Sequence, residues 1–188
     1  MMEPRRCPWA ENDPLLKRYH DREWGVPLHE DRKLFEFLTL EGAQAGLSWL
    51  TVLKKRRAYR IAFDDFDPRK IANYSASDVR RLLGNREIIR NRLKIAATVT
   101  NARQFLLVKQ EFGSFNNYVW QFVGDKTIKH AFRSLSSIPS KSKESDQMSE
   151  GLRKRGFKFV GSTICYAFMQ AVGMVNDHTI RCFRYDEV

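Results

Sequence analysis

Four residues of metal-binding type lie near the two ends of this chain of 188 residues. Cys7 and His20 lie near the N-terminus, and His178 and Cys182 lie near the C-terminus. The spacing of the second pair places both side chains on one face of a helix or an extended turn. Two thiolates and two imidazoles match the preference of structural zinc for four nitrogen or sulfur ligands. The first pair does not have the spacing of a standard zinc finger, so spacing alone leaves open that these are ordinary half-buried residues.

The other cysteine and the N-terminal segment indicate the compartment. Cys165 lies in an apolar segment and is expected to be a core thiol. Three cysteines and a charged start without an apolar run argue against a secreted, disulfide-bonded protein. No stretch approaches the ~20 apolar residues of a membrane span. The sequence therefore predicts a cytoplasmic protein that does not enter a membrane.

The charge of the chain indicates a polyanionic partner. The formal net charge is +11 and the isoelectric point is about 9.8. Nucleic acid is the first candidate and an anionic membrane surface the second, while a merely basic soluble protein is the alternative. Hydrophobic residues make up 43% of the chain and aromatic residues 12%, which favours a globule with a sizeable core.

The elements that must position these residues are predicted to be helices. Asp13-Pro14, Asp31, Ser48, the Ser75–Asp78 pair and Ser145 have the form of helix starts. Glycines 113 and 156 mark helix ends. The helical segments expected from these signals and from apolar spacing cover residues 15–24, 32–46, 49–63, a short segment after 68, one after 75, 87–111, 115–123, 146–155 and 161–173.

The fold class is predicted to be all-α. No segment shows convincing period-two alternation or a hairpin signal. Residues 134–147 are rich in serine and lysine and are expected to form a loop. One domain over residues 1–188 is expected, with a possible division into two helical lobes, one built from 1–30 with 140–188 and the other from about 31–135.

Four long segments resemble the DNA-3-methyladenine glycosylase I family of the helix-hairpin-helix glycosylase superfamily. These segments are CPWAENDPLLKRYHDREWGVP at 7–27, LEGAQAGLSWLTVLKKR at 40–56, IIRNRLKI at 88–95 and LRKRGFKFVGSTICYAFMQAVGMVNDH at 152–178. The resemblance runs over about residues 6–182. It implies a structural Zn²⁺ on Cys7, His20, His178 and Cys182, because four protein ligands leave no open position for water. Such a metal crosslink closes a loop of nearly the whole chain, and it would stabilise the fold by about 4–5 kcal/mol in the chain-entropy model.

The resemblance also implies a base pocket. Glu41 lies in a stretch of small residues and matches the glutamate that contacts the exocyclic amine of the base, and it is the predicted catalytic residue. Tyr19 and Trp49 match the aromatic residues that stack on the base. An N3-methylated adenine is cationic, so electron-rich rings and a carboxylate suit it. Taken without the resemblance, Glu41 would be read as a solvated helix residue, Trp49 as core and Tyr19 as packing for the metal site.

Phosphate contacts are expected at a helix-hairpin-helix over roughly residues 78–100, with its turn near Gly84–Ile88. The basic residues around this turn are Arg86, Arg90, Arg92 and Lys94. Glu87 stands where the family's hairpin commonly has glycine, and a carboxylate there could weaken phosphate binding. Two further departures, Leu16 where some relatives have tyrosine and Ala43 where some have glutamine, are expected near the pocket.

The resulting prediction is a monomeric, monofunctional glycosylase that flips 3-methyladenine out of alkylated double-stranded DNA and hydrolyses its N-glycosidic bond in base excision repair. No aspartate lies between Asp78 and Asp125, which agrees with a family thought to lack the activating aspartate of its superfamily. No lysine is placed by motif as a Schiff-base nucleophile, so lyase activity is not expected. One alternative is a catalytically inactive relative that binds DNA lesions, and another is a zinc-stabilised protein-interaction domain. The protein is expected to work at the bacterial nucleoid.

Overall fold

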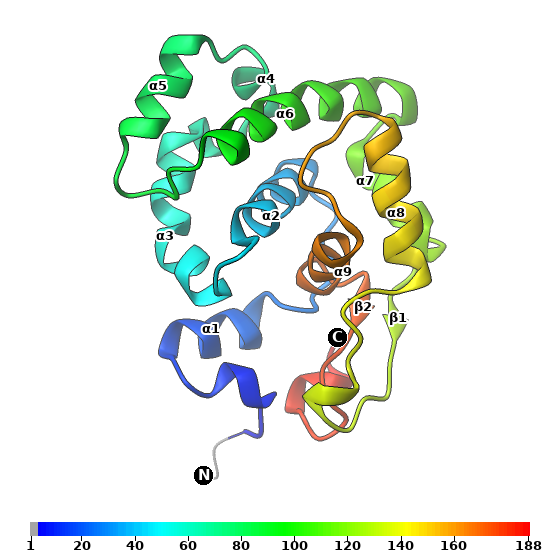
Figure 1. Cartoon of the computed structure of the whole chain (residues 1–188). Coiled ribbons are helices and arrows are strands. Elements are labelled where there is room, and N and C mark those ends of the chain that lie inside the picture. The colour runs from blue at the N-terminus through cyan, green and yellow to red at the C-terminus, as the bar shows by residue number, and fades with distance from the viewer. Residues whose placement is uncertain (1–3) are drawn as a thin grey trace.

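Helices form most of the computed structural model, which describes residues 4–188 (Figure 1). The α-helices are α1 (Pro14–Arg22), α2 (Asp31–Gln44), α3 (Trp49–Ala62), α4 (Pro68–Ile71), α5 (Ala76–Gly84), α6 (Arg92–Phe112), α7 (Phe115–Trp120), α8 (Lys143–Lys154) and α9 (Ser162–Ala171). Short 3-10 helices are η1 (Pro8–Ala10), η2 (Asp64–Phe66), η3 (Gln121–Val123), η4 (Leu135–Ser137) and η5 (Phe183–Asp186). Within this part of the chain, no helix is long and apolar enough to cross a membrane.

Side-chain caps begin several of these helices where the sequence predicts them. The Asp13 carboxylate accepts a hydrogen bond from the Leu15 amide at 2.7 Å. Ser48 caps α3, and Ser75 with Asp78 forms a reciprocal capping box at α5. Each cap satisfies a backbone N–H that has no partner within its helix. These caps fix where α1, α3 and α5 begin.

Three predicted helix starts are wrong. Asp31 is the first residue of α2 and not its cap; its carboxylate accepts hydrogen bonds from Lys109 Nζ and the Asn116 amide, both at 2.9 Å. Ser142 caps α8 in place of Ser145, which lies in the first turn and completes a capping box with it. The helix predicted over 87–111 begins only at Arg92.

Helix α2 forms the centre of the molecule and packs against α3, α6 and α9 (Figure 1). All ten residues from Leu34 to Ala43 are buried, so this helix is covered on every side. A helix buried all round belongs to the core and not to the surface. Any polar side chain of α2 that lies in this stretch must therefore find a partner inside the protein or a cavity.

The all-α prediction needs a small correction, because two short strands pair in parallel. Strand β1 (Ile128–Lys129) pairs with β2 (Val175–Asn176), with Ile128 opposite Val175. Two residues are too few to show alternation in a sequence, which is why this pair was not predicted. The pairing holds the segment that leads directly into Asp177 and His178.

The two ends of the chain meet beside α9. Leu28 N donates to Val172 O and Gly25 N donates to Gln170 O, both at 3.0 Å, and Phe183 N donates to Arg5 O at 2.9 Å. Gly173 makes the approach possible, since it has a φ of +72° and an added Cβ would lie 2.4 Å from the backbone of Val26 and Pro27. The N-terminal segment is thereby fixed against the C-terminal one.

Candidate active site and metal centre

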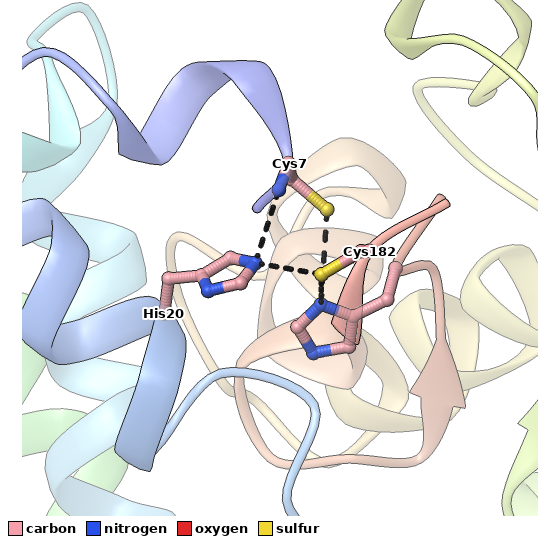
Figure 2. Close-up of side chains that lie close together, drawn as sticks. Cys7, His20 and Cys182 are labelled. Atoms are coloured by element: carbon pink, nitrogen blue, oxygen red, sulfur yellow. Dashed lines mark hydrogen bonds between the residues drawn. The ribbon is translucent and has the colours of Figure 1, made fainter. Parts of the chain in front are cut away.

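The four predicted metal ligands form one buried cluster, part of which is labelled in Figure 2. Cys7 precedes η1 and His20 lies in α1, while His178 and Cys182 lie between β2 and η5. Cys182 Sγ is 3.3 Å from His20 Nε2 and 3.5 Å from His178 Nδ1. Cys7 Sγ is 3.7 Å from His178 Nδ1. All four ligand atoms lie within 4.8 Å of one another.

These separations fit a tetrahedral zinc ion. Bonds of about 2.3 Å to sulfur and about 2.0–2.1 Å to nitrogen give sulfur–nitrogen edges of about 3.6 Å in a tetrahedron. The three sulfur–nitrogen separations of 3.3, 3.5 and 3.7 Å lie on either side of that value. The donor set of two sulfurs and two nitrogens is the one that structural zinc prefers. The cluster therefore has the chemistry and the size of a closed four-coordinate site.

The remaining ring nitrogens of both histidines already have partners. His20 Nδ1 is 2.8 Å from Asp21 Oδ1, and His178 Nε2 is 3.1 Å from the carbonyl oxygen of Trp24. With an N–H directed at each of these oxygens, His20 Nε2 and His178 Nδ1 are unprotonated, and the Cys7 amide donates to His20 Nε2 at 3.4 Å. Those are the two nitrogens that face the sulfur atoms. The outer partners thus select the tautomers that a metal ion needs.

One sulfur atom is also prepared for a cation. Hydrogen bonding to the Cys7 thiol lowers the pKa of Cys182. The amide of Thr179 donates to Cys7 Sγ at 3.4 Å. Thiolate is the form of cysteine that binds metals. The cluster can therefore supply negative charge to a bound divalent ion.

A cavity of about 360 Å³ lies next to this cluster. Two tryptophans lie between the metal-ligand cluster and the cavity. The Trp9 ring meets the His20 ring edge-on with 5.4 Å between the ring centroids, and the Trp24 ring meets the His178 ring edge-on with 4.6 Å between the centroids. Both tryptophans also line the cavity. The complete lining consists of Trp9, Tyr19, Trp24, Glu41, Gln44, Trp49, Leu135, Ile138, Pro139, Ser140, Thr163, Tyr166, Ala167 and Gln170.

The structure brings the three predicted pocket residues to this one cavity. Tyr19 comes from α1, Glu41 from α2 and Trp49 from the first turn of α3. The rings of Tyr19 and Trp49 lie 5.4 Å apart at an interplanar angle of 52°. The buried Trp49 Nε1 has no hydrogen-bond partner among the described residues. Two aromatic faces and a carboxyl group therefore meet in one space.

Glu41 is buried without a compensating charge. Its side chain belongs to a residue that is only 4% exposed, and no described residue donates a hydrogen bond to it. Burial raises the pKa of Glu41 to about 8, because the ionised form loses its hydration. Burial, followed by the nearby Glu41 charge, also raises the pKa of Tyr19. A buried carboxyl group of this kind favours a cationic or hydrogen-bond-donating ligand.

The opposite wall of the cavity was not predicted. It consists of η4 and the residues after it, including Leu135, Ile138 and Pro139, together with α9 residues such as Tyr166 and Gln170. The sequence predicts only a loop rich in serine and lysine over residues 134–147. The signal that could have indicated this wall is the pair of apolar residues Leu135 and Ile138 within that polar segment.

The predicted phosphate-binding segment is a pair of helices joined by a turn. Helix α5 ends at Gly84, α6 begins at Arg92, and the two helices pack against each other (Figure 1). Arg86, Arg90 and Arg92 are exposed in or next to this turn. Asn91 Oδ1 already accepts hydrogen bonds from the Leu93 and Lys94 amides, at 3.0 and 3.1 Å. The amides of Leu93 and Lys94 in the first turn of α6 are therefore satisfied within the protein.

Lys94 differs from the three arginines. Its Nζ donates to the carbonyl oxygens of Ala43 and Ala45 at 2.8 and 2.7 Å, at the end of α2. Burial lowers the pKa of Lys94. The ammonium group thus satisfies carbonyls that lack partners at a helix end. In a similar way, Lys55 Nζ donates to the carbonyl oxygens of Arg86 and Glu87 in the turn.

The positions that depart from the family pattern lie outside the cavity lining. Neither Leu16 nor Ala43 lines the cavity in the described structure. Ala43 is buried and presents its carbonyl oxygen to Lys94. Glu87 is exposed, and its amide donates to Asn85 Oδ1 at 2.9 Å. None of these three residues therefore lines the cavity.

Comparison with known proteins gives one consistent result. The family model described as methyladenine glycosylase matches residues 9–185. DNA-3-methyladenine glycosylase 1 of Escherichia coli (strain K12) is 52% identical over 180 residues, which cover 96% of each chain.

Solved structures agree over the same length. A crystal structure of a 3-methyladenine DNA glycosylase I superimposes with a TM-score of 0.93 at 54% identity, covering 95% of this chain and 98% of the other. A 3-methyladenine DNA glycosylase I from Staphylococcus aureus, studied for its recognition of 3-methyladenine, gives a TM-score of 0.92 at 37% identity, covering 95% of each chain. The fold and nearly the full length of the chain are shared with these enzymes.

Proposed function

The chain belongs to the methyladenine glycosylase family, and we propose that it removes 3-methyladenine from alkylated DNA through the cavity at Glu41. It is a DNA glycosylase, a hydrolase of N-glycosyl bonds. The observation that carries the assignment of the site is the buried, unpaired carboxyl group of Glu41 in the same cavity as the rings of Tyr19 and Trp49. A flipped base needs flat faces to stack on and polar groups that read its edge.

The chemistry of the lesion suits this cavity. N3-methylation makes adenine cationic within the nucleotide, so its glycosidic bond is already weakened. Electron-rich rings attract a cation, and the Glu41 carboxylate adds a charge-assisted hydrogen bond. A cationic base would also offset the loss of hydration that disfavours the ionised carboxylate. Glu41 thus contributes most when the base carries positive charge.

The lining supports a monofunctional reaction. Neither lysine nor aspartate occurs among the described residues that line the cavity. A Schiff-base intermediate would require an amine there. Hydrolysis would then depend on the lability of the lesion, with water attacking the anomeric carbon while Tyr19, Trp49 and Glu41 hold the departing base.

The metal centre would hold a structural Zn²⁺ on Cys7, His20, His178 and Cys182. The ion would supply charge balance and crosslinking, because no coordination position remains for water or substrate. Trp9 and Trp24 lie between this centre and the cavity. The centre therefore stabilises one wall of the base pocket without taking part in the reaction.

The turn between α5 and α6 would contact the DNA backbone as a helix-hairpin-helix. Arg86, Arg90 and Arg92 are exposed there and can neutralise phosphates of the double strand. Lys94, although it was predicted to contribute, is engaged with the end of α2. We propose that Lys94 holds the backbone of residues 43–45 in place, and with it Gln44, which lines the cavity. The protein would act as a monomer on the bacterial nucleoid.

The direct test is base release from DNA methylated at N3 of adenine. We expect the purified, zinc-loaded protein to release free 3-methyladenine and leave an abasic site without a strand break, as measured by chromatography and gel electrophoresis. An inactive lesion-binding relative would bind the same DNA without releasing base, and an interaction domain would show no salt-dependent DNA binding.

A further inference from the structure

A second buried carboxylate, Asp177, organises the far wall of the cavity. Its side chain is fully buried, immediately before the metal ligand His178. Asp177 Oδ2 accepts hydrogen bonds from Tyr166 Oη and Gln170 Nε2, each at 2.7 Å. Asp177 Oδ1 lies 2.6 Å from His130 Nδ1. A single buried oxygen atom of Asp177 thus accepts the hydrogen bonds of both Tyr166 and Gln170.

This arrangement fixes which atom of Gln170 faces the ligand. The amide nitrogen of Gln170 donates to Asp177 Oδ2 and therefore points toward Asp177. The carbonyl oxygen Oε1 is then the free end of the amide, and no described residue donates to it. Gln170 lines the cavity together with Glu41. The Gln170 amide on α9 and the Glu41 carboxyl group on α2 therefore belong to one cavity lining.

We propose that Gln170 is a specificity-determining residue that accepts a hydrogen bond from the exocyclic amine of the methylated base, and that Asp177 is its positioning residue. This inference rests on the proposed function. An exocyclic amine carries two hydrogens, so it can donate to Glu41 and Gln170 together. A guanine base places a carbonyl oxygen at the corresponding position, where it would face the Gln170 carbonyl oxygen and neither oxygen could donate a hydrogen bond. Gln170 thus selects 3-methyladenine over 3-methylguanine.

The first test compares release of the two bases from DNA methylated at N3 of both purines. In Gln170→Met the side chain keeps its length but loses the acceptor. We expect the ratio of single-turnover rate constants for 3-methyladenine over 3-methylguanine to fall about tenfold, because a lost hydrogen bond in a closed site changes discrimination by about that factor. The same substitution at Gln104, a half-buried glutamine away from the cavity on α6, is the matched control and should leave the ratio unchanged.

The second test asks whether Asp177 acts through Gln170. Asp177→Asn has nearly the same shape but can donate, so the Gln170 amide is free to reverse and present its N–H groups. We expect the same loss of preference in this variant, and no additional loss when it is combined with Gln170→Met. His130→Ala removes another hydrogen-bond partner of Asp177, at a residue outside the cavity lining, and should keep the preference. Zinc content and circular dichroism are measured for every variant.

The outcomes separate this inference from the proposed function. Absence of 3-methyladenine release by the unmodified enzyme would contradict the proposed function itself. Normal release with an unchanged base preference in Gln170→Met would overturn the role of Gln170, whatever happens in the Asp177 variant. An Asp177→Asn protein that folds and binds zinc but keeps its preference would overturn the positioning role. If that variant does not fold, Gln170→Met alone still decides the specificity claim.

Discussion

Glu41 and Asp177 are both buried carboxyl groups, but their surroundings differ in a way that indicates different roles. Asp177 meets three polar side chains at 2.6 to 2.7 Å. Glu41 meets none, and burial raises its pKa to about 8. A carboxyl group whose oxygens have hydrogen-bond partners inside the protein positions its neighbours, whereas a carboxyl group without such partners in a cavity is available to a ligand.

The raised pKa of Glu41 predicts a pH-dependent stability difference. In the unfolded chain a glutamate has a pKa of about 4.3, so between that pH and about 8 the folded state binds one proton more than the unfolded state. The free energy of unfolding that Glu41 contributes therefore falls as the pH rises through this window. Urea unfolding should show Glu41→Gln becoming progressively more stable than the original chain from pH 5 to pH 8, by a few kcal/mol at most. Parallel curves over this range would show that the carboxyl group is not buried unpaired.

At the scale of elements, the sequence located helix starts better than it located the spaces between helices. Asp13, Ser48 and the Ser75–Asp78 box could be recognised because a cap is a local interaction of a few residues. The start of α6 was placed too early because Ile88 and Ile89 fit the apolar spacing of a helix, although Asn91 is the cap. Apolar periodicity does not distinguish a helix from a buried turn.

The cavity shows the same limit. The resemblance to a family identified Tyr19, Glu41 and Trp49, and the structure brings these residues together at one space. Leu135 and Ile138 give a local signal for the other wall, but their packing opposite α9 depends on long-range contacts. The charge of Lys94 alone predicts a contact with a DNA phosphate. Its position over the end of α2 could be seen only when the helices were assembled.

The position of Lys94 predicts an effect on stability and not on phosphate binding. Lys94→Met should lower the free energy of unfolding by about 1–3 kcal/mol, because two carbonyl oxygens at the end of α2 lose their donor. The salt dependence of DNA binding should stay the same. Thermal unfolding and binding titrations at several salt concentrations measure the two properties.

Arg90→Ala is the contrasting variant in the same turn. Its exposed guanidinium should have little effect on stability, but its removal should reduce the slope of log binding constant against log salt by about 1. If Lys94→Met changed the slope by the same amount, Lys94 would be a phosphate contact after all.

At the scale of the whole molecule, the cluster of Cys7, His20, His178 and Cys182 joins segments that are separated by most of the chain. Backbone hydrogen bonds such as Leu28 to Val172 bring the same two ends together. Trp9 and Trp24 contact the histidines of this cluster on one side and line the base cavity on the other. The integrity of the pocket should therefore depend on the connection between the chain ends.

Removal of the metal ion should weaken the whole fold. The Cys182→Ala variant is expected to lose bound zinc and to lower the free energy of unfolding by up to about 4–5 kcal/mol, the chain-entropy value for so long a loop. Metal analysis and calorimetry on the same samples check both effects. The buried thiol Cys165 provides the control: Cys165→Ala should retain one zinc ion per chain. Loss of zinc from Cys182→Ala without a change in unfolding temperature would contradict a stabilising role.

The most direct measurement compares two glutamates of the same helix. Glu41 faces the cavity, whereas Glu36 is held by Arg56 and Arg60 at 2.6 and 2.9 Å on another side of α2. Single-turnover release of 3-methyladenine should slow about tenfold to a hundredfold in Glu41→Gln, because a charge-assisted hydrogen bond to the base is lost, and change little in Glu36→Gln once the protein is folded. Equal rates for Glu41→Gln and the unmodified enzyme would contradict the assignment of this cavity as the active site.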